Sequence, residues 1–377
     1  MRTLNDNLKR GAWWRVMLAV LLLAPAAHAA EIHSNGRGGG AWSDPQTWHG
    51  HQVPEAADTV VIAMRDTVTF DRDDRAQPSC AALYLDPEAV LTFERGDHQR
   101  TLTVAGPVES YGTIRLDGTR NRGGRFALRL VGEGAEQRTI HLRENAALLL
   151  YGHEAHPNGE RTVHLAADTL DPEAEAEAEM GRIAADGDAM IDLHHSRIQD
   201  FELALANLDN TGAESNERLN VIGNHLVGVT ALKLHACDTP TIRDNHFQAD
   251  GDVRRVMAIE LRGVSLPEIR GNTIEGAYNV GIYTWGGTSE TIQDNDIIGC
   301  NTGIRLHSTD PSVKNVRVSA TERGVYLYHG NPVLEKVVVR DAALPYLLHE
   351  SNAQFTDCSA PAPPPAEDEQ EPADDAD

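Results

Sequence analysis

A short pattern recurs along the second half of the chain at a spacing close to 21 residues. In four successive units an asparagine stands three residues after one apolar residue and two residues before another, as in Val221, Asn224 and Leu226. Counted from Ser196, successive members of the series lie 28, 21, 27, 23, 21, 21 and 21 residues apart. Because one coil of this length cannot bury its apolar face alone, the period predicts coils that stack on one another around a continuous core.

The recurring asparagine is expected to form a hydrogen-bonded ladder inside the stack. An amide at the same bend of every coil lies above the next amide and can bond to it, as in other stacked-strand ladders. We therefore predict a structural ladder of Asn224, Asn245, Asn272 and Asn295. Small or apolar residues take the same place in the later coils, at Val316, Val337 and Cys358.

Each unit also carries a second strand, whose alternation separates an inner face from an outer face. Successive side chains of a strand point to opposite sides, so apolar pairs such as Leu232 and Leu234 are expected inside. Two outward columns remain, in which neighbours lie about 4.8 Å apart. Column one is Lys233, Glu260, Tyr283, Arg305, Tyr326 and Leu347, and column two is His235, Arg262, Trp285, His307, Tyr328 and His349. We call the two columns together the strip.

The four-residue sequences that end on the asparagines resemble a known fold family. They read Val-Ile-Gly-Asn at 221–224, Ile-Arg-Asp-Asn at 242–245, Ile-Arg-Gly-Asn at 269–272 and Ile-Gln-Asp-Asn at 292–295. They resemble the parallel β-helix repeats of pectate-lyase-like proteins. The resemblance implies an all-β fold, a right-handed single-stranded parallel β-helix (β-solenoid), over residues 190–360.

Residues 30–165 have the texture of short β-branched strands separated by Gly, Pro and Asp turns. They resemble the G8 domain of some large cell-surface and hyaluronan-handling proteins, which often precedes a β-helix. The residues that carry this resemblance are Trp42, Trp48, the Val-Pro at 53–54 and the Asp-Thr-Val at 58–60. Where the family has a glycine turn, this chain has Arg65 and Asp66. The resemblance implies a G8-like domain at 30–165, and no catalytic residue is assigned within it.

The N-terminus has the features of an export signal. Basic residues between Lys9 and Arg15 precede an apolar core at 16–23, and a small-x-small cleavage site follows at 27–29. The apolar core is far shorter than the roughly 20 residues that span a bilayer. We therefore predict a signal peptide at 1–29 and a periplasmic or secreted protein with no membrane span after cleavage.

Much of the net charge of −24 lies in two acidic segments. One, at 171–179, favours an acidic loop or short helix at 166–189 that is not a coil of the stack. The other ends the chain and predicts a disordered, Pro-rich acidic tail at 361–377. Because no basic patch balances these acids, nucleic acid is not expected as a partner.

The strip favours an anionic polysaccharide as the partner. Aromatic faces stack on sugar rings, and Arg, Lys and His pair with carboxylates or sulfates. The alternative is a solvated sheet face whose aromatic and charged pairs only stabilise neighbouring strands. Trp285 favours binding, because a large exposed aromatic side chain is costly to keep as decoration. The expected substrate-binding residues are Lys233, His235, Glu260, Arg262, Tyr283, Trp285, Arg305, His307, Tyr326, Tyr328 and His349.

Catalysis by the strip would fit β-elimination better than hydrolysis. A polysaccharide lyase needs a cation to neutralise the uronate and a base to remove the C5 proton. Arg262 and Arg305 suit the first role, and the column neighbours His307 and Tyr328 suit the second. The sequence leaves open whether the protein is an enzyme at all.

A glycoside hydrolase would need two carboxylates within about 5 to 9.5 Å of each other. The strip supplies Glu260, so a second acid would have to come from a turn, such as Asp250 or Asp252. This requirement makes a hydrolase the less supported type of enzyme.

No resident cofactor or metal is expected from the histidines. His307 and His349 stand two coils apart, about 9.6 Å, which one ion cannot bridge. Ca²⁺ stays open as a cofactor, because hard cations need only oxygen ligands. The candidate turn carboxylates are Asp250 with Asp252, and Asp294 with Asp296.

The sequence therefore predicts an exported β-helix protein that binds, and could depolymerise, an anionic glycan along the strip. The first alternative is a non-catalytic structural or adhesive protein of the cell envelope. The second is a metal-handling periplasmic β-helix protein. Neither the polymer nor the oligomeric state is fixed by the sequence.

Overall fold

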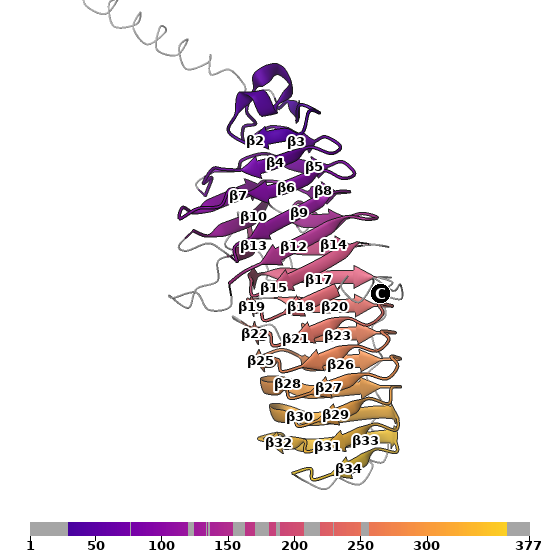
Figure 1. Ribbon diagram of the computed structural model, residues 1–377. Coiled ribbons are helices and arrows are strands. Elements are labelled where there is room, and N and C mark those ends of the chain that lie inside the picture. The colour runs from indigo at the N-terminus through magenta and orange to yellow at the C-terminus, as the bar shows by residue number, and fades with distance from the viewer. Residues whose placement is uncertain are drawn as a thin grey trace, which may run out of the picture.

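The chain folds as one elongated stack of coils that runs from the N-terminal end to the C-terminal end (Figure 1). The computed structural model describes residues 29–75, 77–119, 124–132, 134, 136–153, 163–169, 181–185, 189–206, 219–228, 230–249 and 256–359. The acidic tail at 361–377 and all but the last residue of the expected signal peptide lie outside these ranges. Every strand pairing along the stack is parallel, so the fold is the expected right-handed parallel β-helix.

Three ladders of strands form the sides of the stack. The first ladder is β2 (Gly39–Ala41), β4 (Thr67–Phe70), β6 (Val90–Phe93), β9 (Thr113–Asp117), β12 (Ala147–Tyr151), β15 (Met190–His194), β18 (Leu219–Ile222), β21 (Thr241–Arg243), β24 (Glu268–Arg270), β27 (Thr291–Gln293), β29 (Ser312–Lys314), β31 (Val333–Glu335) and β34 (Gln354–Thr356).

The second ladder is β1 (Glu31–His33), β3 (Thr59–Ile62), β5 (Ala82–Leu85), β8 (Val108–Ser110), β11 (Thr139–Leu142), β14 (Gly181–Ala185), β17 (Phe201–Ala206), β20 (Ala231–His235), β23 (Met257–Arg262), β26 (Val280–Trp285), β28 (Asp296–His307), β30 (Arg317–Gly330) and β33 (Leu344–Ser351). The third is β7 (Arg100–Val104), β10 (Phe126–Gly132), β13 (Val163–Thr169), β16 (Arg197–Gln199), β19 (His225–Val227), β22 (His246–Gln248), β25 (Thr273–Glu275), the first halves of β28 and β30, and β32 (Val338–Arg340).

The core is made of columns of aliphatic side chains, one from each coil. On the first ladder the register places Val221 beside Ile242, and Ile269 beside Ile292, and all four are fully buried. On the second ladder the expected inward pairs also form buried columns. Leu348, near the C-terminal end, is the member of these pairs that is only half-buried. Because burial of apolar area is the main driving force of folding, each coil depends on its neighbours for stability.

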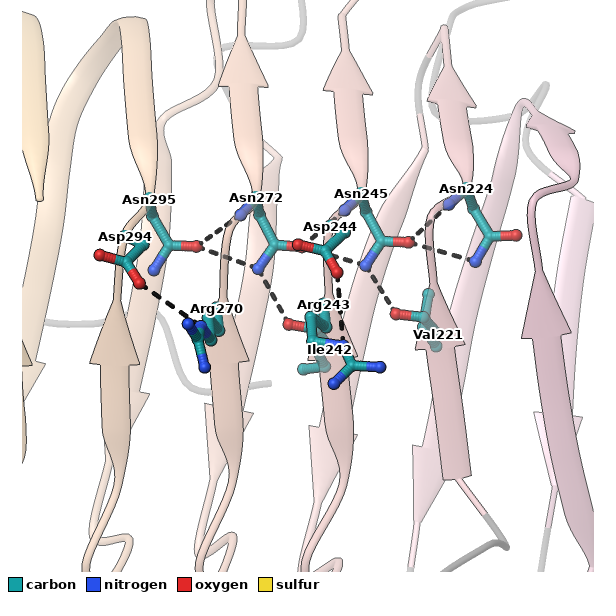
Figure 2. A network of polar contacts seen from close by, with 10 residues as sticks. All are labelled: Val221, Asn224, Ile242, Arg243, Asp244, Asn245, Arg270, Asn272, Asp294 and Asn295. Carbon is teal, nitrogen blue, oxygen red and sulfur yellow. Dashed lines mark hydrogen bonds and ion pairs between the residues drawn. The ribbon is translucent and has the colours of Figure 1, made fainter. Parts of the chain in front are cut away.

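The expected asparagine ladder is present at the bend between the first and third ladders (Figure 2). The side chain of Asn245 accepts from the backbone N–H of Asn224 at 2.9 Å and from its Nδ2 at 3.1 Å. Asn272 accepts the same two bonds from Asn245, each at 3.0 Å, and Asn295 accepts them from Asn272 at 2.9 and 3.0 Å. All four amides are buried, and the ladder therefore pairs backbone groups that no strand pairing reaches.

The ladder ends where the asparagines end. Val316 and Val337 are fully buried in the same position. Cys358, in the same position, is partly exposed, and it lies in the last coil that the structure describes. Its thiol lies 3.6 Å from the carbonyl of Leu334, which is the bond that the asparagine Nδ2 makes in earlier coils.

The N-terminal region builds coils of the same stack. Its strands belong to the same three ladders, and Trp42 and Trp48 are buried with ring centroids 5.1 Å apart at its end. Arg65 has a φ of +65°, so it adopts the left-handed conformation that a glycine turn would supply. The next residue, Asp66, accepts from the backbone N–H groups of Gly36 and Gly38, each at 2.8 Å. Membership of the G8 family stays a prediction.

Strands occupy both ends of the segment for which we expected an acidic loop or short helix, 166–189. β13 (Val163–Thr169) pairs with β10 and β16, and β14 (Gly181–Ala185) pairs with β11 and β17. The prediction was therefore wrong for residues 166–169 and 181–185, which are parts of coils. The acidic run at 171–179 lies outside the described residues.

Candidate functional site

The two outward columns of the strip are present in the expected register on the second ladder. Column one pairs Glu260 with Tyr283 and Arg305 with Tyr326, and column two pairs Trp285 with His307 and Tyr328 with His349. Parallel pairing without a shift in this part of the strands keeps like positions in line from coil to coil. The alternation of the sequence therefore placed these side chains on the correct face.

Column one is an alternating stack of guanidinium groups and tyrosine rings. Arg305 lies 5.4 Å from the ring centroid of Tyr283 and 5.4 Å from that of Tyr326. Arg262 covers Tyr283 at 5.7 Å, and Arg323 covers Tyr326 at 5.7 Å. Each cation–π contact of this kind contributes about 0.5–1 kcal/mol when exposed and more when water is excluded.

This stacking changes the accessibility that we expected for column one. Tyr283 was expected to be exposed, but only 4% of it is accessible, because guanidinium groups from the neighbouring coils cover its ring. Glu260 is 9% exposed and receives Nε–H of Arg262 at 2.6 Å. Lys233 forms an ion pair with Glu202 at 3.2 Å. Column one thus contributes to stability first and offers limited surface to a ligand.

Column two is a more open band of aromatic rings. Trp285 is 43% exposed, and its ring centroid lies 5.9 Å from that of His307. His307 meets Tyr328 edge to face at 4.6 Å, and Tyr328 stacks on His349 at 4.7 Å. Arg262 lies over Trp285 at 5.6 Å, so a cation stands beside the exposed indole. This band combines apolar ring surface with cationic groups.

Two residues of the strip were missed by the sequence reasoning. Arg323 was missed because it lies one position before the alternating segment at 324–328. His329 was missed because simple alternation would turn it away from column two. Its φ of +53° instead brings its ring to 4.2 Å from that of Tyr328. Glycines with positive φ at the same point of two earlier coils, Gly263 and Gly286, were the available signal.

The candidate catalytic residues are brought together only in part. His307 and Tyr328 are in contact through their rings, whereas Arg262 is engaged by Glu260 and Arg305 lies between two tyrosines. The arrangement can present positive charge and ring faces to a polyanion. Whether it removes a proton stays a prediction, as does hydrolysis, because Asp250 and Asp252 lie outside the described residues.

A buried carboxyl follows column two in the next turn. Glu290 is 2% exposed and accepts a hydrogen bond from the hydroxyl of Thr309. Burial raises the pKa of Glu290, the Thr309 bond opposes this, and the charge of Asp310 adds to it. Glu290 takes the place that proline holds at Pro267 in the preceding coil.

A second polar cluster lies on the first ladder, away from the strip. Asp192 accepts from the hydroxyl of Tyr151 at 2.6 Å and contacts Nε2 of His194 at 2.6 Å. Burial alone would raise the pKa of Asp192, but the hydrogen bonds from His194, Tyr151 and Asn220 outweigh it and lower that pKa. The polar groups of this cluster form hydrogen bonds with one another, so we interpret the cluster as stabilising the outer face of the sheet.

Of the turn carboxylates named for Ca²⁺, Asp294 and Asp296 are bound to other groups, and Asp250 and Asp252 lie outside the described residues. Asp294 contacts Arg270 at 3.4 Å (Figure 2). It also accepts from Nδ2 of Asn315 at 2.6 Å. Asp296 forms a two-bond ion pair with Arg317 at 2.6 and 3.0 Å. Within the part of the chain that the structure describes, no three His, Cys, Asp or Glu side chains come together as a metal site.

The helices of the described ranges are the two short 3-10 turns η1 (Pro45–Thr47) and η2 (His49–His51). Neither helix has the length and apolar character to cross a membrane.

Comparison with known proteins supports the fold. Residues 208–360 match the family model described as a right handed beta helix region, which falls within the span where the repeat predicted this fold. No curated protein matches the chain. Among solved structures, the surface protein and adhesin PfbA of Streptococcus pneumoniae is similar at 11% identity, over 80% of this chain and 86% of that one, with a TM-score of 0.24. A likeness this weak says nothing about the function of this chain.

Proposed function

We propose that the protein is an exported, periplasmic or secreted β-helix protein that binds an anionic polysaccharide through column two of the strip. The observation that carries the proposal is the aromatic band of column two, in which Trp285 is 43% exposed beneath a guanidinium group. Contiguous apolar surface rimmed by polar groups marks interaction sites on soluble proteins, and the rings that follow Trp285 in column two are partly open to solvent. Ring faces suit sugar rings, and the adjacent cations suit uronate carboxylates.

We assign the ligand contact to fewer residues than the sequence suggested. Column one is largely closed by its own cation–π and ion-pair contacts, so we assign it to supporting the band rather than to primary contact with the ligand. Column two and His329 then supply the surface that a polymer would touch. Arg262 belongs to both, because it covers the buried Tyr283 and the exposed Trp285.

A non-catalytic structural or adhesive role is the second candidate. The closed stack of Arg305 between Tyr283 and Tyr326 favours it, since those contacts stabilise neighbouring coils without any ligand. In that case the strip would strengthen the solenoid and present a surface for another protein. Binding assays separate the two roles.

The first experiment mixes the purified mature protein with hyaluronan, polygalacturonate and alginate, with and without Ca²⁺. Gel retardation reports binding, and growth of ultraviolet absorbance reports the unsaturated products of a lyase. We expect retardation with at least one polymer. Absorbance growth would add lyase activity and direct attention to His307, Tyr328 and the arginines. Retardation by none of the polymers would refute polysaccharide binding and favour the structural role.

A matched pair of variants assigns the binding to column two. Trp285→Ala with His307→Ala should weaken retention at least tenfold and lower the melting temperature little, because both side chains face outward. The control is Tyr111→Ala with His225→Ala, which removes an aromatic residue of similar exposure (44%) and an imidazole of the third ladder. Equal binding by the two variants would show that column two is not the site.

A further inference from the structure

Three imidazoles surround one ring at the C-terminal end of column two. The ring centroid of Tyr328 lies 4.6 Å from that of His307, 4.2 Å from His329 and 4.7 Å from His349. His329 is also 6.4 Å from His307 and 6.2 Å from His349. Strands β28, β30 and β33 each contribute one of these histidines, so the cluster extends over three coils.

The charged groups around the cluster are of both signs. On β33, Glu350 contacts Nδ1 of His329 at 3.0 Å. Arg305 on β28 and Arg323 on β30 lie against the ring of Tyr326. Tyr326 belongs to column one, next to the column that holds His307 and His349. In the turn after His307, Asp310 accepts from the backbone N–H of Asn331. Arg305 of column one and Arg323 therefore supply fixed positive charge beside the cluster, and the partly buried imidazoles lie in or next to column two.

An ordinary imidazole gains a proton near pH 6.5, within the range in which extracellular and periplasmic fluids vary. When neutral, the three rings add stacking surface and hydrogen-bonding nitrogens to the band but no charge. When protonated, they add up to three positive charges within about one Debye length of each other. A polyanion laid over the band would relieve their mutual repulsion, so protonation and binding of the polymer are linked.

We propose that His307, His329 and His349 make the affinity of the strip for an anionic glycan depend on pH, with tighter binding in acid. The inference rests on the proposed function and adds its regulation. The sign follows from the linkage: a polyanion favours the protonated rings, so the association constant rises as the pH falls from 8 to 5.5. One surface ion pair changes an equilibrium by a factor of roughly 1.4 to 5, so three give an effect on the order of tenfold.

The test measures the Kd of the full mature chain for polygalacturonate and for dextran sulfate at pH 5.5 and pH 8 and at constant ionic strength. Neither probe changes its charge appreciably in this range, so a pH effect comes from the protein. We expect Kd to fall about tenfold between pH 8 and pH 5.5. In the triple variant His307→Gln, His329→Gln, His349→Gln the ratio of the two Kd values should approach 1.

The control variant is His225→Gln with His246→Gln, which removes a stacked pair of imidazoles (5.0 Å) from the third ladder. It should keep the pH dependence of the unaltered protein. Melting temperatures at both pH values confirm that each variant is folded. A pH dependence that persists in the triple variant, or that disappears in the control, would overturn the assignment.

The outcomes also separate this inference from the proposed function. Equal binding of the unaltered protein at pH 5.5 and 8 overturns the pH dependence and leaves polysaccharide binding in place. Absence of binding to both probes at both pH values overturns the two together. Tighter binding at pH 8 would reverse the sign of the linkage and refute the role given to the three histidines.

Discussion

Replacement of Asn272 by leucine should remove one rung of the buried amide ladder while keeping the same number of side-chain heavy atoms. Nδ2 of Asn272 donates to the carbonyl of Ile242 at 2.9 Å and to Oδ1 of Asn295 at 3.0 Å. Its Oδ1 accepts the backbone N–H of Asn245 at 3.0 Å and Nδ2 of the same residue at 3.0 Å. The substitution deletes all four of these hydrogen bonds.

The cost can be worked out from the groups that are left without partners. Nδ2 of Asn245 keeps its bond to Val221 at 2.6 Å, and Oδ1 of Asn295 keeps the backbone N–H of residue 272 at 2.9 Å. The backbone N–H of Asn245 loses its acceptor, and the carbonyl of Ile242 loses a donor. Each such buried group costs about 1–3 kcal/mol, partly offset by burial of the leucine, so we expect a loss of about 2–5 kcal/mol.

The matched control is Val316→Leu, which places leucine at the corresponding bend two coils later, where Val316 is fully buried. It removes no side-chain hydrogen bond and leaves the amide of Asn245 bonded, so its cost is that of adding one methylene to a buried site, about 1–3 kcal/mol. Urea unfolding followed by circular dichroism gives both values. Hydrogen exchange of the peptide at 241–248 reports whether the amide of Asn245 has lost its protection. Equal stability of the two variants, with that amide still protected, would refute the ladder as a source of stability.

Two further predictions concern the dependence of stability on pH. Burial raises the pKa of Glu290, so the wild-type protein loses stability as the pH rises through that pKa. The variant Glu290→Gln can still accept the hydrogen bond from Thr309. It should therefore melt higher than wild type at pH 8, and the difference in melting temperature should shrink toward pH 4. A constant difference across this range would contradict the assignment. Hydrogen bonds from His194 and Tyr151 lower the pKa of Asp192 despite its burial. Its contribution to the free energy of unfolding is therefore present at neutral pH and lost as the pH falls through the lowered pKa. Asp192→Asn should lower the free energy of unfolding by about 1–2 kcal/mol at pH 7 and by progressively less below pH 4. Thermal melts from pH 3 to 8 check both, and a variant as stable as wild type at pH 7 would show that the Asp192 cluster contributes nothing.

The sequence by itself determined the coil, its register and the faces of its strands. These features depend on local rules: the 21-residue period fixes how coils stack, and the two-residue alternation fixes which side chains enter the core. For this reason the asparagine ladder and the pairs Trp285–His307 and Tyr328–His349 could be predicted residue by residue. Residues 208–360, where the repeat is most regular, are also those that match the β-helix family model.

Only the tertiary structure decided which outward side chains are open to a ligand. Tyr283 points outward as expected, yet it is buried, because arginines from the coils on both sides lie over its ring. His329 joins column two because its left-handed backbone breaks the alternation, which no count of residues reveals. Accessibility is set by side chains more than 20 positions away in the sequence. The period can place a residue on a face, but its exposure depends on how long, flexible side chains of other coils settle upon it.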